Sequence, residues 1–304
     1  MPAEALSIRL RDERMLAYVT VGESSGVPVL AVHGTPGCRD PATWADAAAA
    51  TGARVISPDR PGYGLSDFHP GQTLLDWPSD VRELADALGL DRFAVVGVSG
   101  GGPYAAACGY ALPDRVAAVG LVCAVGPFWD VPAVDATATD EAGGWIRELI
   151  DLARVDPGSA EAHAREECGR DAEMCGRDPE EFVAFWFDGE GAPSPDSAVL
   201  QTPERREHAK DQIREALRAG VDGYTQDELI ITVRPWGFGL DEIGVAVHLW
   251  HGELDTLVPV QSARYVARAI PNCSPRFFPD EGHLLTFRHS EEILRTLVEA
   301  TAHQ

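Results

Sequence analysis

The sequence predicts an α/β fold: a mostly parallel, eight-stranded sheet flanked by helices and interrupted by a helical insertion. Short apolar runs that resemble buried strands, and their regular alternation with helical segments, predict the sheet. A long stretch without an apolar strand, residues 127–240, predicts the insertion. The chain has 304 residues, which is enough for one large domain with an insertion and a sizeable core.

The first three strands lie before the first helix. Residues 5–11 and 14–21 flank a polar turn at Asp12 and Glu13, so we expect an antiparallel hairpin at the sheet edge. Pro28 to Val32 is an apolar run without polar alternation, which is typical of a strand buried on both faces.

Strands and helices then alternate along the chain. We predict the other strands at residues 53–58, 92–98, 115–124, 245–250 and 275–279. We predict the helices of this part at residues 41–51, 73–89, 102–112, 260–270 and 289–302. In the second of these helices apolar residues recur at helical spacing. This alternation favours parallel strands joined by right-handed crossovers.

Helical segments dominate the insertion. We predict them at residues 139–154, 159–175, 179–187 and 203–219. The last begins after Thr202, a suitable N-cap, and ends at Gly220. Gly189, Gly191, Pro193 and Pro195 predict a loop. The predicted domains are therefore a core of residues 1–126 and 241–304 and a helical cap of residues 127–240.

The charge balance restricts the partners of this protein. With 25 basic and 48 acidic side chains the net charge is −23. An acidic surface repels phosphate backbones and anionic lipids, so nucleic acid and membranes are excluded as expected partners. A small-molecule substrate is the expected partner, and a monomer and a homodimer both remain open.

Cysteine usage and the absence of long apolar runs favour a cytoplasmic location. The six cysteines include no C-x-x-C pair and no spacing suited to zinc. The first twenty residues lack the apolar core of a secretory signal. No apolar run approaches the ~18 residues that a membrane span needs.

A nucleophile motif lies between a strand and a helix. Residues 97–101 read Gly-Val-Ser-Gly-Gly, a G-x-S-x-G pattern after an apolar strand. Glycines on both sides remove side chains that would collide with a serine in a sharp turn. The helix N-terminus would stabilise a developing oxyanion. We therefore expect Ser99 to be a nucleophile rather than part of a phosphate-binding turn, since the chain lacks a Walker lysine.

A second glycine-rich loop, His33-Gly34-Thr35-Pro36-Gly37, follows the strand at 28–32. It lies at the carboxyl edge of the sheet, where open α/β folds bind ligands. Its backbone and the N–H of Gly100 are expected to hold an oxyanion, and Pro36 has no N–H, which favours Thr35 as the donor. We expect His33 to support the loop rather than to react.

A serine hydroxyl needs a base, and the base needs an orienting carboxylate. His283 follows Asp280-Glu281-Gly282 after the last strand, and Asp255 follows the strand at 245–250. Both loops reach the edge that carries Ser99, and the chain order Ser99, Asp255, His283 is the order of an α/β-hydrolase triad. Glu253 is the rival acid.

Together these segments resemble the α/β-hydrolase family. The matches are HGTPG (33–37), DRPGYGLSD (59–67), GVSGGGPYA (97–105), HGELDTLVP (251–259) and EGHL (281–284). The resemblance implies the α/β-hydrolase fold with a cap, no cofactor or metal, and an acyl-enzyme mechanism that cleaves a carboxylic ester. Members that use an elbow aspartate, the epoxide hydrolases and haloalkane dehalogenases, are disfavoured by Ser99.

Three alternatives stay open. The triad could serve a C–C hydrolase, lyase or cyclase, or the chain could be a non-catalytic ligand receptor. Proline iminopeptidases share the HG-x-PG loop, and their recognition of an amino terminus needs acidic cap residues. The candidates for that role are Glu180, Glu181, Asp188 and Glu190.

Aromatic residues of the predicted cap suggest a largely apolar substrate pocket. We expect the pocket to include Phe128, Trp129, Trp145, Phe185 and Trp186. An uncharged or aromatic ester would suit such a pocket.

Overall fold

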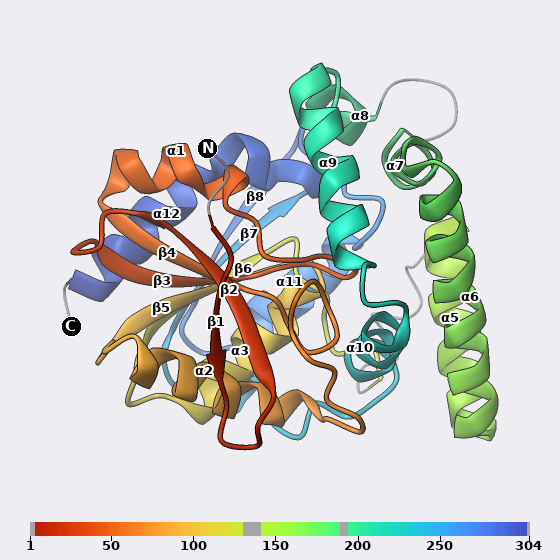
Figure 1. Ribbon diagram of the computed structural model, residues 1–304, viewed down its shortest axis with the longest axis horizontal. Helices are drawn as coiled ribbons and strands as arrows, with labels where there is room; N and C mark the ends of the chain where they lie inside the picture. The colour runs from red at the N-terminus through yellow and green to blue at the C-terminus, as the bar shows by residue number, and fades with distance from the viewer. Residues whose placement is uncertain (1–3, 130–140, 189–193, 303–304) are drawn as a thin grey trace.

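The computed structural model describes residues 4–129, 141–188 and 194–302, with the backbone alone for residues 141–145. Its eight strands form one sheet in the order β1-β2-β4-β3-β5-β6-β7-β8 (Figure 1). The strands are β1 (Leu6–Arg9), β2 (Met15–Gly22), β3 (Val27–Val32), β4 (Ala53–Pro58), β5 (Phe93–Val98), β6 (Val116–Val122), β7 (Ala246–Gly252) and β8 (Cys273–Phe278). This confirms the predicted eight-stranded α/β sheet.

Strand direction follows the predicted pattern. β1 and β2 pair as an antiparallel hairpin, and β2 also runs antiparallel to β4. The pairs from β4 through β8 are all parallel. The central strands β5 and β6 are almost fully buried, which explains their apolar composition without polar alternation.

Helices cover both faces of the sheet. α1 (Ala42–Thr51) and α12 (Thr286–Ala302) pack on one face, around Trp44, Leu294 and Leu297. α2 (Trp77–Ala87), α3 (Gly101–Ala111) and α11 (Val260–Ala269) cover the other face. α12 begins at Thr286, three residues before its predicted start. One-turn helices η1 (Leu74–Asp76), η2 (Leu240–Glu242) and η3 (His283–Leu285) complete these connections.

The helices between β6 and β7 lie beside the carboxyl edge of the sheet (Figure 1). We refer to residues 127–240 as the helical insertion. Its helices are α5 (Glu141–Val155), α6 (Pro157–Arg177), α7 (Pro179–Phe187), α8 (Pro195–Val199), α9 (Pro203–Ala216) and α10 (Asp222–Thr232). The sequence predicted four of them and missed α8 and α10.

α10 was missed because it is buried on every side. Residues 223–232 are all buried, so the helix lacks the polar face that periodicity detects. Its first turn packs directly on the loop after β4: a Cβ on Gly223 would lie 2.5 Å from the carbonyl oxygen of Gly62. This contact brings α10 next to the carboxyl ends of the strands.

Among the helices that the structure describes, none combines the length and apolarity needed to cross a membrane.

Candidate active site

Ser99 lies in a strained turn between β5 and α3. Its φ angle is 53°, a left-handed value that is uncommon for a residue with a side chain. The glycines of the motif are required by space: a Cβ on Gly97 would lie 2.2 Å from the carbonyl oxygen of Gly101, and one on Gly101 would lie 2.4 Å from that of Val32. The turn therefore presents the Ser99 side chain at the carboxyl edge of the sheet.

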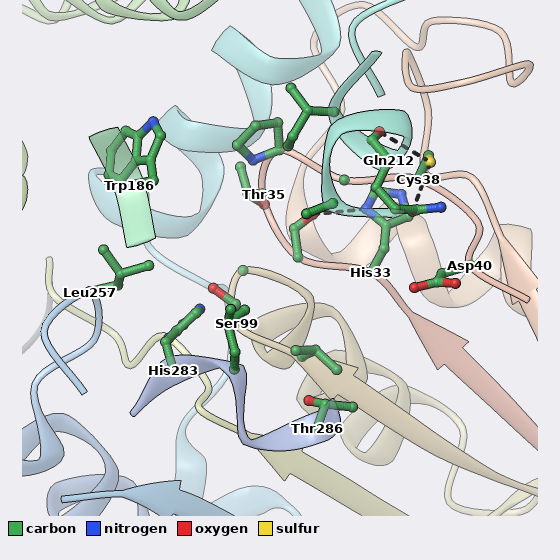
Figure 2. Close-up of a pocket in the computed structure, with 18 of the residues that line it drawn as sticks. His33, Thr35, Cys38, Asp40, Ser99, Trp186, Gln212, Leu257, His283 and Thr286 are labelled. Atoms are coloured by element: carbon green, nitrogen blue, oxygen red, sulfur yellow. Dashed lines mark hydrogen bonds between the residues drawn. The ribbon is translucent and has the colours of Figure 1, made fainter. Parts of the chain in front are cut away.

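The loops after β7 and β8 bring Asp255 and His283 to the same edge. The Nδ1 atom of His283 lies 2.8 Å from the Oδ2 atom of Asp255. The other carboxylate oxygen of Asp255 accepts hydrogen bonds of 2.9 Å from the backbone N–H groups of Leu257 and Val258. Figure 2 shows the His283 ring beside the Ser99 side chain. The structure thus brings together the three residues predicted from widely separated motifs.

Burial and charge set the protonation of this group. Burial alone would lower the pKa of His283, but the charge and hydrogen bond of Asp255, and then the charge of Asp196, raise the pKa above its ordinary value. Burial would raise the pKa of Asp255, yet His283 and the backbone N–H of Val258 lower it. The pair therefore favours an ionised carboxylate that holds the histidine ring.

The rival residues have other partners. The carboxylate of Glu253 forms a 2.6 Å ion pair with Arg264. His33 accepts a hydrogen bond of 3.0 Å from the backbone N–H of Arg60, and its other ring nitrogen lies 2.8 Å from the carbonyl of Gly34. The expectation that His33 supports the loop is therefore confirmed.

Thr35 and Gly100 lie against each other above Ser99. A Cβ on Gly100 would lie 2.2 Å from the Thr35 hydroxyl, and one on Gly34 would lie 3.3 Å from the Ser99 Cβ. Among the backbone–backbone hydrogen bonds of the described residues, none has the N–H of Thr35 or of Gly100 as its donor. The two loops that carry the predicted oxyanion donors therefore lie side by side at Ser99.

A buried polar cluster that the sequence did not reveal supports this loop. The Asp227 carboxylate accepts hydrogen bonds from the Thr35 hydroxyl, the Arg60 guanidinium and the hydroxyls of Tyr63 and Tyr104. The Arg60 guanidinium also donates to the carbonyl of His33. We refer to Thr35, Arg60, Tyr63, Tyr104 and Asp227 as the Asp227 cluster. It joins α10 to α3 and to the loops that follow β3 and β4.

A cavity of about 280 Å³ opens at Ser99 and His283. Its lining is mostly apolar and comes from the sheet edge and the insertion, including Phe128, Phe182, Trp186, Ile231 and Leu257. Among its described lining residues there is no lysine or arginine. The carboxyl groups on its wall belong to Asp40 and Glu228, and neither residue lies in a motif that pointed to the site.

Two of the five predicted pocket residues, Phe128 and Trp186, line this cavity. Trp129 does not: it packs against the core cluster, with the Arg154 guanidinium 5.8 Å from its ring. Phe185 is 61% exposed, which corrects the prediction, because α7 buries Phe182 and Val183, and Phe185 points away from Val183 into solvent. The side chain of Trp145 lies outside the described residues.

The acids considered for amino-terminus recognition are engaged elsewhere. Glu180 and Asp188 form ion pairs with Arg206, and Glu181 pairs with Arg177. None of the three lines the cavity, and Glu190 lies outside the described residues.

One cluster has the donor types of a metal site. The side-chain donors of Cys123, Asp255 and His283 lie within 4.8 Å of one another. Asp255 and His283 already bond to each other, and burial followed by the charge of Asp255 raises the pKa of the Cys123 thiol well above its usual range. The cluster therefore favours a neutral thiol beside an acid–histidine pair rather than a metal-binding thiolate.

Comparisons with known proteins agree with this geometry. A family model described as "alpha/beta hydrolase fold" matches residues 27–290. A 2-hydroxymuconate semialdehyde hydrolase from Pseudomonas putida is 25% identical over 283 residues, covering 91% of this chain and 87% of that protein.

Solved structures share the whole architecture. A thermophilic esterase from Thermogutta terrifontis has a TM-score of 0.66 and 25% identity, covering 98% of this chain and 97% of that one. A bromoperoxidase from Bacillus anthracis has a TM-score of 0.68 and 22% identity, covering 99% and 100%.

Proposed function

Because this chain belongs to the α/β-hydrolase fold family and is a hydrolase, we propose that it cleaves a carboxylic ester of a small, uncharged, largely apolar substrate. Ser99 is the nucleophile, His283 the base and Asp255 the carboxylate that orients the base. The observation that carries the proposal is the 2.8 Å hydrogen bond from His283 to Asp255, beside a serine at a left-handed φ.

The reaction follows from the position of each group. Nε2 of His283 takes the proton of Ser99 as its Oγ attacks the acyl carbon. The N–H groups of Thr35 and Gly100 stabilise the resulting oxyanion. His283 then gives the proton to the leaving alcohol. In the second half, His283 takes a proton from water, the water attacks the acyl-enzyme, and His283 returns the proton to Ser99 as the acid leaves.

The cavity supports an uncharged substrate. Its wall is largely apolar, its described lining contains no lysine or arginine, and its His208 is already paired with Asp40 at 3.0 Å. A charged acyl group that enters the cavity would lose its hydration and would find no lysine or arginine among the described lining residues to pair with, which costs binding free energy.

Hydrolysis of a C–C bond is the second candidate. The likeness to the 2-hydroxymuconate semialdehyde hydrolase of P. putida favours it. The name of that substrate denotes a carboxylate, and the cavity of this chain offers no described lysine or arginine to receive one. The ester is therefore the preferred proposal.

The test is labelling by a fluorophosphonate probe, with the modified residue identified by mass spectrometry. We expect labelling at Ser99 that disappears in Ser99→Ala and His283→Ala and persists in Ser159→Ala, an exposed serine on α6. A folded protein that is not labelled would contradict the nucleophile assignment.

A panel of 4-nitrophenyl esters then tests the substrate class. We expect neutral alkyl and aryl acyl groups to be hydrolysed faster than acyl groups of equal length that end in a carboxylate. Preference for the carboxylate series would favour the second candidate.

A further inference from the structure

We infer that Asp196, from the helical insertion, is a positioning residue that holds the loop of the catalytic base. This inference rests on the proposed function of His283. Asp196 lies on α8, and its carboxylate accepts a hydrogen bond of 3.0 Å from the backbone N–H of His283 and one of 2.7 Å from that of Leu284. These two loop residues are 87 and 88 positions from Asp196 in the chain.

The contact has the geometry of a helix cap supplied from a distant segment. His283 and Leu284 begin the short helix η3, and the first N–H groups of a helix have no partner within it. A carboxylate satisfies such groups by accepting hydrogen bonds from them. Asp196 is only 4% exposed, so water does not compete for these bonds.

The Asp196 carboxylate packs closely against the backbone of Gly282. A Cβ on Gly282 would lie 2.6 Å from either oxygen of Asp196, so the glycine before His283 is required for the approach. The backbone of His283 is thus held by the insertion, whereas its ring is held by Asp255 from the core. The base is fixed only when the insertion is docked on the core.

Asp196 also acts on His283 through its charge. The ionisable groups around His283 are Asp255, Asp196, His251 and Cys123. After Asp255, Asp196 is the group that raises the pKa of His283. Loss of its charge would lower that pKa, and since the base must be neutral to act, activity would persist to lower pH.

The test compares Asp196→Asn and Asp196→Ala with the control Asp188→Asn. Asp188 pairs with Arg206 inside the insertion and does not touch the histidine loop. We expect both Asp196 variants to lower kcat by roughly 10- to 100-fold with little change in KM, because the base is misplaced. The acidic limb of the pH profile of kcat/KM should move to lower pH, whereas Asp188→Asn should leave kcat and the limb unchanged.

Wild-type kcat and an unmoved acidic limb in Asp196→Asn would overturn the inference. If kcat falls while the acidic limb does not move, and the Tm falls as well, Asp196 has only a structural role. That outcome would also overturn the inference. Labelling of the wild-type protein at Ser99 separates these outcomes from failure of the proposed function.

A different observation points to a polar subsite at Glu228, and we propose that it binds an uncharged oxygen of the substrate. This proposal also rests on the proposed function. Tyr224, Glu228, Ile231 and Thr232 line the cavity, and their spacing places them on one face of α10. Ile231 reaches Gly100, since its Cδ1 atom lies 3.1 Å from the position of a Cβ there. Glu228 therefore lies one turn of α10 before the residue that contacts Gly100.

The Glu228 carboxyl is suited to donate a hydrogen bond. It is 6% exposed, and none of the described residues donates a hydrogen bond to it. Burial, and next the negative charges of Asp227 and Asp171, raise its pKa well above the usual range and favour the protonated acid. A protonated carboxyl in an apolar wall offers its O–H to an acceptor, such as an ether or carbonyl oxygen.

The test uses 4-nitrophenyl hexanoate and its oxa analogues, isomers of one another in which one acyl CH2 beyond the one next to the carbonyl is replaced by an ether oxygen. For one isomer we expect kcat/KM to exceed that of the hexanoate by roughly 3- to 10-fold, the range of a single net hydrogen bond. Glu228→Gln, which keeps a donor, should retain this preference, and Glu228→Leu should abolish it.

An ether preference that is absent, or that survives Glu228→Leu, would overturn the proposal. Preference for acyl groups that carry an ammonium would overturn it as well, because the carboxyl would then be an anion. Fluorophosphonate labelling of each variant reports whether the triad is intact, independently of the subsite.

Discussion

The Asp227 cluster predicts a large and specific loss of stability. In Asp227→Asn the Arg60 guanidinium loses its charged partner, and the two side chains are only 1% and 3% exposed. Breaking a buried ion pair by removing one partner costs about 3–5 kcal/mol, because an uncompensated charge stays buried. The hydroxyls of Thr35, Tyr63 and Tyr104 also donate to this carboxylate, so we expect the upper part of that range.

Equilibrium unfolding in urea, followed by both tryptophan fluorescence and far-UV circular dichroism, measures this loss. The control is Asp222→Asn on the same helix, whose pair with Arg165 has side chains 58% and 51% exposed. An exposed pair contributes about 0–1 kcal/mol, so the control should be almost neutral.

The double variant Arg60→Met/Asp227→Asn separates charge from packing, because it removes both charges and keeps an amide oxygen for the hydroxyls of Thr35, Tyr63 and Tyr104. No uncompensated charge stays buried in it, so the double variant should be more stable than Asp227→Asn. A loss below about 1 kcal/mol in Asp227→Asn, or a double variant less stable than the single one, would refute the reasoning.

Four further predictions concern the site and its surroundings. Asp255→Asn should lower kcat by about 10⁴-fold, because the amide favours the wrong tautomer of the base; a wild-type rate would contradict the assigned role. In the wild type, kcat/KM should fall as the pH drops through the raised pKa of His283, and Asp255→Asn should move that limb to lower pH. Gly101→Ala places a Cβ 2.4 Å from the Val32 carbonyl and should cost about 1–3 kcal/mol in urea unfolding. Gly169→Ala on α6, with no atom within 4 Å, should stabilise by up to about 1 kcal/mol, and equal effects at the two glycines would contradict the packing. Asp40 pairs with His208 of α9 at 3.0 Å; the pKa of His208 is raised, and that of Asp40 is lowered. This pair stabilises the fold at pH values between the ordinary pKa of a carboxyl group and that of a histidine. The stabilisation is lost as the pH rises through the raised pKa of His208, so the difference in Tm between His208→Ala and the wild type should shrink above neutral pH.

The sequence by itself determined the sheet and the candidate triad. Parallel strands end at one edge, so motifs that directly follow strands meet in space even when far apart in the chain. Ser99, Asp255 and His283 each lie in such a motif, and glycines required by close packing mark the serine turn. These motifs are local in the sequence, so they can be recognised without knowing which other segments they contact.

Only the tertiary structure decided which polar groups support that site. Asp227 and Glu228 lie on a helix that is buried on all sides and has no amphipathic period to detect. Asp196 lies on a five-residue helix, and its partners are backbone N–H groups that no side-chain pattern encodes. The rotation of α7 turned Phe185 to solvent and Trp186 to the cavity, although both are aromatic and adjacent. Such choices depend on how one surface packs on another, and composition alone does not specify that packing.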